Sequence, residues 1–127
     1  MKIAVVGHIE WGSFVRVDHA PKDGEIVHAT ESWEEAAGGG SVAAMQLALL
    51  NGSCVFFTAV GDDERGHKAI DQLRLNGVEV YASVRSSQAT NLAFVHVDTQ
   101  GERTITVSGD LKPDTSSGVL PWDRLYP

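Results

Sequence analysis

Two short, almost purely apolar runs constrain the fold of this chain most strongly. They span residues 3–6 and residues 54–60. Strands whose side chains are apolar on both faces are typical of a sheet that helices cover. A glycine-rich turn and a helical segment separate the two runs, and a second helical segment follows. This order of elements predicts an α/β fold in which both runs are buried strands.

The two helical segments have recognisable ends. The first, residues 42–50, is rich in alanine and leucine, with Ser41 as its expected N-cap and Asn51-Gly52 as a left-handed C-terminal turn. Because it is apolar nearly all round, we expect this helix to be buried. The second helix follows Gly61-Asp62-Asp63 and stops at Asn76-Gly77. Its apolar positions recur at helical spacing: Gly66, Ala69, Ile70 and Leu73.

Two further segments, about residues 13–33 and 80–108, are predicted to form exposed strands outside the core. The first contains the turn Pro21-Lys22-Asp23-Gly24. The second divides into strands at 80–85, 91–98 and 103–108, with a hairpin turn at 99–102. Only two core strands then remain, which is fewer than a doubly wound sheet contains. The sequence therefore predicts an incomplete core.

Charge and cysteine content narrow the class of protein. The 127 residues suit one domain, and 17 acidic against 10 basic residues give a net charge of −7. This balance argues against nucleic acid or an anionic membrane surface as a partner, and we find no basic cluster for a phosphorylated ligand. Cys54, the single cysteine, excludes an intrachain disulfide and is expected to be a small buried residue. Without a signal-peptide pattern or a long apolar run, a cytoplasmic protein is expected.

Most motifs that carry chemistry are missing from the sequence. Gly7 and Gly12 lie five residues apart after the first strand, but Ser13 and Phe14 replace the lysine and hydroxyl residue of a phosphate-binding loop. No dinucleotide-binding glycine pattern occurs in this turn. The five histidines lack metal-ligand spacing, so no metal site is expected.

The glycine triplet Gly38-Gly39-Gly40, followed by Ser41, is the strongest candidate site. Backbone without side chains lets a ligand approach closely, and unpaired N–H groups at a helix start can bind its oxygens. The alternative is a tight turn that serves packing alone. We include all three glycines among the candidate substrate-binding residues.

Six segments of the chain, in order, resemble the PfkB family of ribokinase-like carbohydrate kinases. They are Val5-Val6-Gly7, Pro21-Lys22-Asp23-Gly24-Glu25, Gly38-Gly39-Gly40-Ser41-Val42-Ala43-Ala44, Gly61-Asp62-Asp63-Glu64-Arg65-Gly66, Leu75-Asn76-Gly77-Val78, and Val97-Asp98 with Gly101-Glu102-Arg103-Thr104-Ile105. The resemblance implies a Rossmann-like ribokinase-type core, incomplete here, with a small β-sheet lid formed by about 13–33 and 80–108. It also implies that residues 1–127 are the N-terminal substrate-binding part and that the C-terminal ATP-binding half is absent.

The resemblance further implies a set of acceptor-binding positions. In the family, sugar hydroxyls contact the turn after the first strand, the double glycine, an asparagine in the first helical turn, and the lid. The matching positions here are Glu10, Gly12, Gly38, Gly39, Ala43, Ala93 and Val95. Gly12 stands where many members have an aspartate, and Ala43 stands where they have the asparagine. A site that loses two hydroxyl partners need not prefer ribose, so a larger or differently oxidised acceptor is an alternative.

The function implied by the resemblance is that of an ATP-dependent kinase for a sugar or polyol. The family's catalytic aspartate and its ATP and Mg²⁺ sites belong to the absent half. Gly109-Asp110 does not replace the aspartate motif, because Pro113 follows too closely for a helix to begin there. We therefore expect no catalytic residue, no bound cofactor and no activity in this chain alone. The alternatives are a non-catalytic carbohydrate-binding or regulatory module, or a lid-mediated interaction module.

The resemblance also implies an assembly. Lids of two family subunits often clasp, so a homodimer through the β-lid is expected. The large apolar residues expected on one face of that lid are Phe14, Ile26, Phe94 and Ile105.

Overall fold

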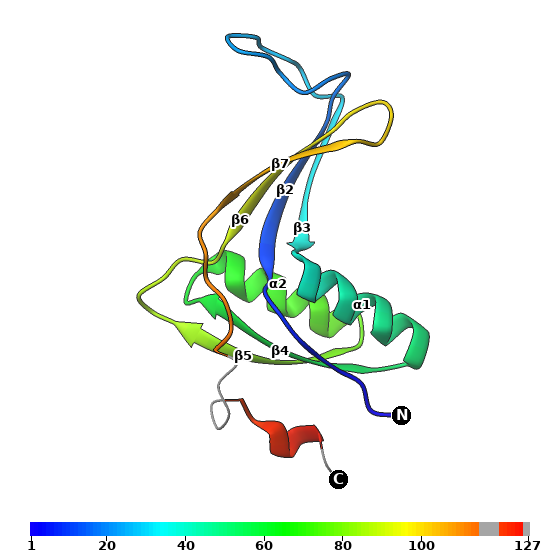
Figure 1. The fold of residues 1–127 in the computed structure, drawn as a ribbon, viewed down its shortest axis with the longest axis vertical. Coiled ribbons are helices and arrows are strands. Elements are labelled where there is room, and N and C mark those ends of the chain that lie inside the picture. Colours follow the sequence, from blue (N-terminus) through cyan, green and yellow to red (C-terminus); the bar gives the residue numbers. More distant parts are fainter. Residues whose placement is uncertain (115–119, 126–127) are drawn as a thin grey trace.

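A three-stranded parallel sheet forms the body of the protein in the computed structural model, which describes residues 1–114 and 120–125 (Figure 1). Its strands are β1 (Ala4–Val6), β4 (Cys54–Gly61) and β5 (Val78–Arg85), in the order β1-β4-β5. Every residue of β4 is buried, which confirms the prediction of a buried strand at 54–60. The same prediction is wrong for β1, because β1 is an edge strand in which Ala4 and Val6 are exposed.

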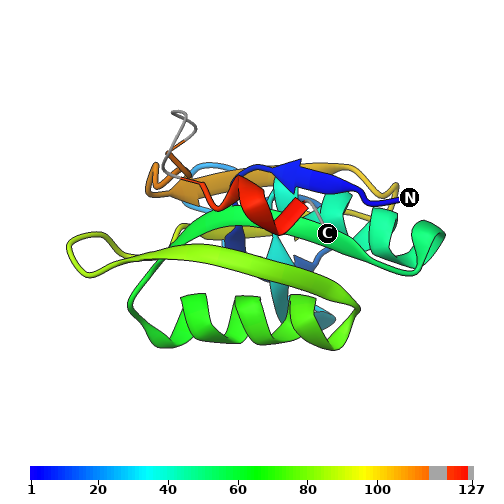
Figure 2. The same ribbon diagram turned by 90° about the horizontal axis from the view of Figure 1, so that it is seen from below.

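Two helices cover one face of this sheet, and a short segment covers part of the other (Figure 2). Helix α1 (Gly39–Asn51) and helix α2 (Glu64–Leu75) pack against the same core cluster as Phe56 of β4. Leu120 and the 3₁₀ turn η1 (Trp122–Leu125) lie on the opposite face. No helix in the part of the chain that the structure describes is long and apolar enough to span a membrane.

The helix ends follow the predictions with one exception. Asp63 caps α2 by accepting the N–H of Gly66 at 2.8 Å, and Gly52 ends α1 in the left-handed conformation, with φ of 84°. The expected Ser41 cap is wrong, since Gly38 occupies the N-cap position. Ser41 lies inside the first turn, where its hydroxyl donates to the Ala37 carbonyl at 2.5 Å. Helix α1 is also only half buried, with Leu49 and Leu50 among its exposed residues.

A second sheet of four strands rises from the body (Figure 1). Its order is β3 (Glu31–Ala37), β2 (Glu10–Arg16), β6 (Leu92–Val97) and β7 (Arg103–Ser108). The outer pairs β2–β3 and β6–β7 are antiparallel, whereas the central pair β2–β6 is parallel. We call these four strands the small sheet.

The small sheet differs from the predicted lid in its boundaries. It begins at Glu10 and includes β3 up to Ala37, while residues 80–85 belong to β5 of the body sheet. The core therefore has three strands, not two. The error has a physical cause: Val78 and Val80 are buried beneath α2, but the intervening side chains of this edge strand are more exposed. Such a half-buried edge strand has the same period-two pattern as a strand of an exposed sheet.

The lower end of the small sheet is continuous with the core of the body. Trp11, Ala36 and Leu92 pack in the same cluster as the buried residues of α2. The Ala36 N–H donates to the Gln72 side chain of α2 at 2.8 Å. Asn91, just before β6, donates to and accepts from the backbone of Leu111, at 2.8 and 2.9 Å. These contacts fix the base of the sheet on the body.

Cys54 fits the role predicted for it. Its side chain is buried at the start of β4, and burial raises the pKa of its thiol. A raised pKa keeps the thiol protonated and unreactive at neutral pH, so Cys54 is a small apolar core residue.

Candidate functional site

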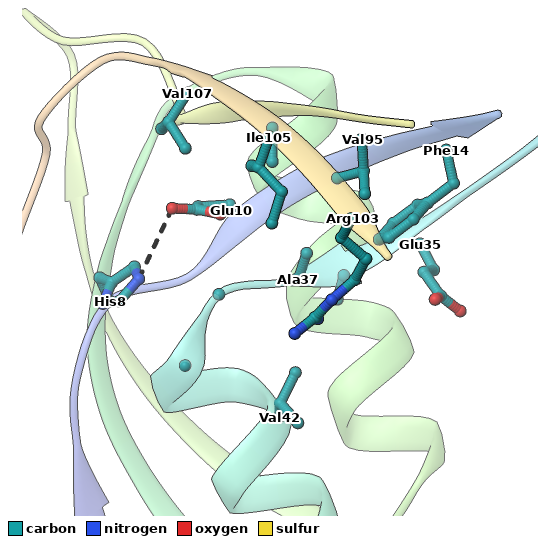
Figure 3. Close-up of a pocket in the computed structure, with 14 residues that line it drawn as sticks. His8, Glu10, Phe14, Glu35, Ala37, Val42, Val95, Arg103, Ile105 and Val107 are labelled. Atoms are coloured by element: carbon teal, nitrogen blue, oxygen red, sulfur yellow. Dashed lines mark ion pairs between the residues drawn. The ribbon is translucent and has the colours of Figure 1, made fainter. Parts of the chain in front are cut away.

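A cleft of about 480 Å³ lies between one face of the small sheet and the start of α1 (Figure 3). The body contributes His8, Gly38, Gly39 and Val42 to its lining. The small sheet contributes the rest, chiefly Glu10, Phe14, Ala93, Val95, Arg103, Ile105 and Val107. The cleft therefore joins the turn after β1, two of the three glycines and all four strands of the small sheet, which are far apart in the sequence.

Strand register explains why the sheet side of the cleft is mostly apolar. Side chains alternate between the two faces of a strand, so Glu10, Gly12 and Phe14 of β2 share one face. Phe14 pairs with Val95 of β6, and Val95 pairs with Ile105 of β7. Directly paired residues point to the same side of a sheet. These apolar side chains therefore form a continuous wall over the cleft.

The three glycines of the triplet have different roles. Gly38 has a φ of 95°, and a Cβ there would come within 3.2 Å of the Glu10 nitrogen and the His8 ring. At Gly39 the nearest atom to a Cβ would be His8 Cε1 at 3.8 Å, so this position opens into the cleft. At Gly40 a Cβ would lie 2.7 Å from the His8 carbonyl oxygen and 2.9 Å from Gly7 Cα. Gly40 therefore serves the close packing of α1 on the turn after β1.

Glu10 places a carboxylate at the bottom of the cleft. Its side chain is only 13% exposed, and its Oε1 lies 3.5 Å from Nε2 of His8, the contact drawn in Figure 3. A second carboxylate, Glu35, lines the cleft farther along the sheet and accepts a hydrogen bond from the Trp33 indole at 3.4 Å. A partly desolvated carboxylate is a strong acceptor for hydroxyl groups.

Five of the eight predicted site residues line the cleft, namely Glu10, Gly38, Gly39, Ala93 and Val95. Gly12, Gly40 and Ala43 do not. Ala43 is exposed on α1 outside the cleft, and its neighbour Val42 lines it instead. Gly12 is covered, because a Cβ there would lie 2.4 Å from Cε2 of Phe14. The ring of Phe14 thus fills the space that a side chain at position 12 would need.

Reasoning from the sequence missed nine lining residues. They are His8, Phe14, Glu35, Ala36, Ala37, Val42, Arg103, Ile105 and Val107. The sequence carried one usable signal, because side chains two residues apart on a strand share a face. Phe14 therefore shares a face with Gly12, and Ile105 shares a face with Arg103. That signal could be used only with the strand pairing, which brings β2, β6 and β7 together.

The described residues do not fit a magnesium site. Within residues 1–114 and 120–125, no three histidine, cysteine, aspartate or glutamate side chains gather where they could hold a metal ion. The turn after β1 leads into strand β2 and not into a helix, which confirms that it is not a phosphate-binding loop. We assign no step of a reaction to a metal or nucleotide in this chain.

Comparison with known proteins identifies the family. Residues 1–117 match the pfkB family carbohydrate kinase. The chain belongs to this family. It is 30% identical over 108 residues to the ribokinase of Dictyostelium discoideum, covering 84% of the chain and 34% of that protein.

Two solved ribokinase structures show the shared pfkB fold. That of Thermotoga maritima superposes with a TM-score of 0.74 at 25% identity, covering 98% of this chain and 42% of the other. That of Arabidopsis thaliana, complexed with ribose and ATP, has a TM-score of 0.64 at 27% identity and covers 84% and 35%. These matches confirm the predicted fold class, an α/β ribokinase-type core with a small β-sheet. The chain spans about a third of the length of the curated relatives it matches.

Proposed function

We propose that the complete enzyme is an ATP-dependent kinase for a sugar or polyol, and that the cleft of this chain binds the acceptor. One acceptor hydroxyl would receive the γ-phosphate of ATP. The observation that carries the proposal is the position of Glu10, a largely buried carboxylate between the glycine triplet and the small sheet, in a pfkB family chain. The bound ribose and ATP of the Arabidopsis ribokinase support the same class of reaction.

The chemistry of the cleft suits a polyhydroxylated molecule. Glu10 can accept hydrogen bonds from two neighbouring hydroxyls, and the bare backbone at Gly39 lets the acceptor come close to the start of α1. The apolar side chains of the small sheet offer a surface for the C–H face of a sugar. We propose that the small sheet acts as a lid over this acceptor.

The phosphoryl-transfer groups would lie in the part of the relatives that this chain does not span. ATP with Mg²⁺ supplies the transferred group and the charge neutralisation of such a reaction. This chain would select and orient the acceptor, and it would be inactive alone.

A non-catalytic carbohydrate-binding or regulatory module is the second candidate. It is favoured by the Phe14 ring, which covers Gly12 and leaves no carboxylate there. Both candidates predict that the cleft binds a carbohydrate, but only the kinase predicts that the complete protein phosphorylates it. Phosphorylation of a bound sugar by the complete protein would decide for the kinase.

Calorimetry with neutral sugars and polyols tests the acceptor site, using Glu10→Gln and Gly39→Val in the 127-residue chain. Losing a charge-assisted hydrogen bond costs about 1.5–3 kcal/mol, so the Kd should rise roughly 10- to 150-fold. Valine at Gly39 should block the cleft while leaving the backbone unstrained, because Gly39 is not among the glycines with positive φ.

Matched controls are Glu102→Gln on the exposed hairpin and Ala43→Val on the exposed side of α1. Circular dichroism checks folding. If both test variants bind sugars as the wild type does, the acceptor site is elsewhere.

A further inference from the structure

Arg103 is a cation of the cleft that has no partner for its guanidinium among the described residues. It begins β7 and lines the cleft, and Figure 3 shows its side chain extending from the small sheet toward Val42 of α1. Among the described residues, no hydrogen bond, ion pair or ring contact involves the Arg103 guanidinium. An arginine that points into a binding cleft without a partner is available to a ligand.

Arg16 provides an internal comparison on the same face of the small sheet. Arg16 pairs with Val97 of β6, and Val97 pairs with Arg103 of β7, so both arginines lie on the cleft face. The guanidinium of Arg16 is already engaged: its Nε lies 3.0 Å from Glu31 Oε2, and its Cζ lies 5.5 Å from the Trp33 ring centre. Of these two cations, only Arg103 is left unneutralised, in a chain whose net charge is −7.

Glu10 and Arg103 are therefore separated within the cleft, and among the described residues no ion pair joins Arg103 to Glu35, the second carboxylate of the lining. Glu10 is at the bottom, beside the turn after β1, whereas Arg103 reaches across the cleft from the first residue of β7 (Figure 3). One end suits hydroxyl donors and the other suits an anion.

On the basis of the proposed acceptor role, we propose that the acceptor carries a carboxylate that Arg103 binds, in addition to hydroxyls that Glu10 binds. Within the proposed sugars and polyols, the preferred substrate class is therefore a sugar acid. A guanidinium pairs with a carboxylate through two parallel hydrogen bonds, so one arginine matches one such group. A phosphate dianion is disfavoured because Glu10 and Glu35 line the same cleft and would repel its second charge.

A matched set of ligands tests this proposal by calorimetry on the 127-residue chain. Glucose, glucuronate and glucose 6-phosphate differ only at C6, and the galactose set repeats the comparison. We expect the acid to bind best. Arg103→Gln should weaken acid binding about tenfold or more, with less than a twofold change for the neutral sugar. Arg103→Lys should restore part of the loss because it keeps the charge. Arg65→Gln is the control, since Arg65 is an exposed arginine outside the cleft.

The outcomes separate this inference from the proposed function. If Glu10→Gln weakens sugar binding but Arg103→Gln leaves acid binding unchanged, the acceptor site stands and the sugar-acid inference is wrong. Preference for the 6-phosphates over the acids would also overturn it. If no sugar of either set binds, both proposals fail. Preserved circular dichroism in Arg103→Gln, which changes an exposed side chain, excludes unfolding as the cause of any loss.

Discussion

Asp63 holds Thr90 through two hydrogen bonds, although 27 positions separate the two residues. The Thr90 N–H donates to Asp63 Oδ2 at 2.8 Å, and the Thr90 hydroxyl donates to Oδ1 at 2.6 Å. Burial alone would raise the pKa of Asp63. The hydrogen bonds from Thr90 and Gly66, together with the charge of Arg65, instead hold that pKa below its usual value. One carboxylate thus caps α2 and fixes the segment that leads into β6 of the small sheet.

We expect Asp63→Asn to lower the free energy of unfolding by about 1–3 kcal/mol at pH 7, because the amide cannot accept all three bonds. The folded-state pKa of Asp63 is below its unfolded value. The stabilisation of the folded state by ionised Asp63 is therefore fully present above its pKa in the unfolded chain, about 3.9. It is lost as pH falls through the pKa of Asp63 in the folded protein. Urea unfolding at several pH values should show the difference from wild type narrowing below about pH 4. Asp62→Asn, an exposed neighbour that contacts His67, is the control. Equal losses in both variants would contradict the role of Asp63.

The last two glycines of the triplet, Gly39 and Gly40, should respond differently to substitution by alanine. Gly40→Ala pushes a methyl group against the His8 carbonyl and Gly7 Cα, so we expect a loss of about 1–3 kcal/mol in unfolding free energy. Gly39→Ala places its methyl in the open cleft and should change stability by less than about 0.5 kcal/mol. Urea denaturation compares them. A Gly40→Ala protein as stable as Gly39→Ala would show that the close packing at Gly7 is not required.

In the loop between β2 and β3, the titratable side chain of His19 contacts two carboxylates. The His19 ring lies 3.0 Å from an Asp18 carboxylate oxygen and 2.6 Å from one of Glu25, and these hydrogen bonds raise the pKa of His19. Because the pKa of His19 is higher in the folded protein than in the unfolded chain, protonated His19 stabilises the folded state. This stabilisation is fully present below the pKa of the unfolded chain and is lost as pH rises through the pKa of the folded protein. An NMR titration should find the pKa of His19 above 6.5 and should find it lowered in Glu25→Gln. An unchanged pKa in that variant would refute the contact.

The 127-residue chain should bind ATP with Mg²⁺ no better than a nonspecific protein and should phosphorylate no sugar. Calorimetry with ATP and Mg²⁺, and a coupled assay over the sugar sets above, measure the two quantities. Any turnover, or micromolar affinity for ATP, would mean that the phosphate-binding groups lie within this chain.

Assembly through the small sheet stays a proposal, and the structure changes how it must be tested. Phe14 and Ile105 lie on the cleft face, whereas Phe94 lies on the opposite face and is 46% exposed. The expectation of one shared apolar face is therefore wrong. We propose a homodimer packed small sheet to small sheet. Light scattering after size exclusion should give twice the chain mass, and Ile105→Glu and Phe94→Glu identify which face is used. A monomer at tens of micromolar would contradict the dimer.

The body could be predicted well because its signals are local. The apolar run at 54–60, the helix start after Gly61-Asp62-Asp63 and the spacing from Gly66 to Leu73 each depend on neighbouring residues, and all three are confirmed. The assignment of residues 80–85 failed because the pattern of an edge strand does not reveal which sheet it joins. The same limit applies to β1, whose apolar side chains gave no sign that the strand lies at an edge.

The candidate site could be predicted only in part, because half of it depends on strand pairing. The glycine triplet could be found from the sequence because it begins a predicted helix, and Glu10, at the start of β2, was implied by the family resemblance. Ile105 and Arg103 enter the cleft only because β7 pairs with β6 and β6 with β2. The contact between Phe14 and Gly12 depends on a side-chain rotamer, which no pattern of residue types specifies.

Backbone lines one side of the cleft and side chains line the other, and this difference determines which mutations the cleft tolerates. Along α1 its wall is bare backbone at Gly38 and Gly39, where added side chains would alter the turn or block the cleft. Across from that wall, the small sheet presents side chains whose substitution leaves the strand pairing intact. If the cleft binds the acceptor as proposed, mutations on the sheet would alter which acceptor fits while the folding of the turn is preserved. Descendants of one gene, or variants in a library, would then diversify their substrates from the sheet side alone.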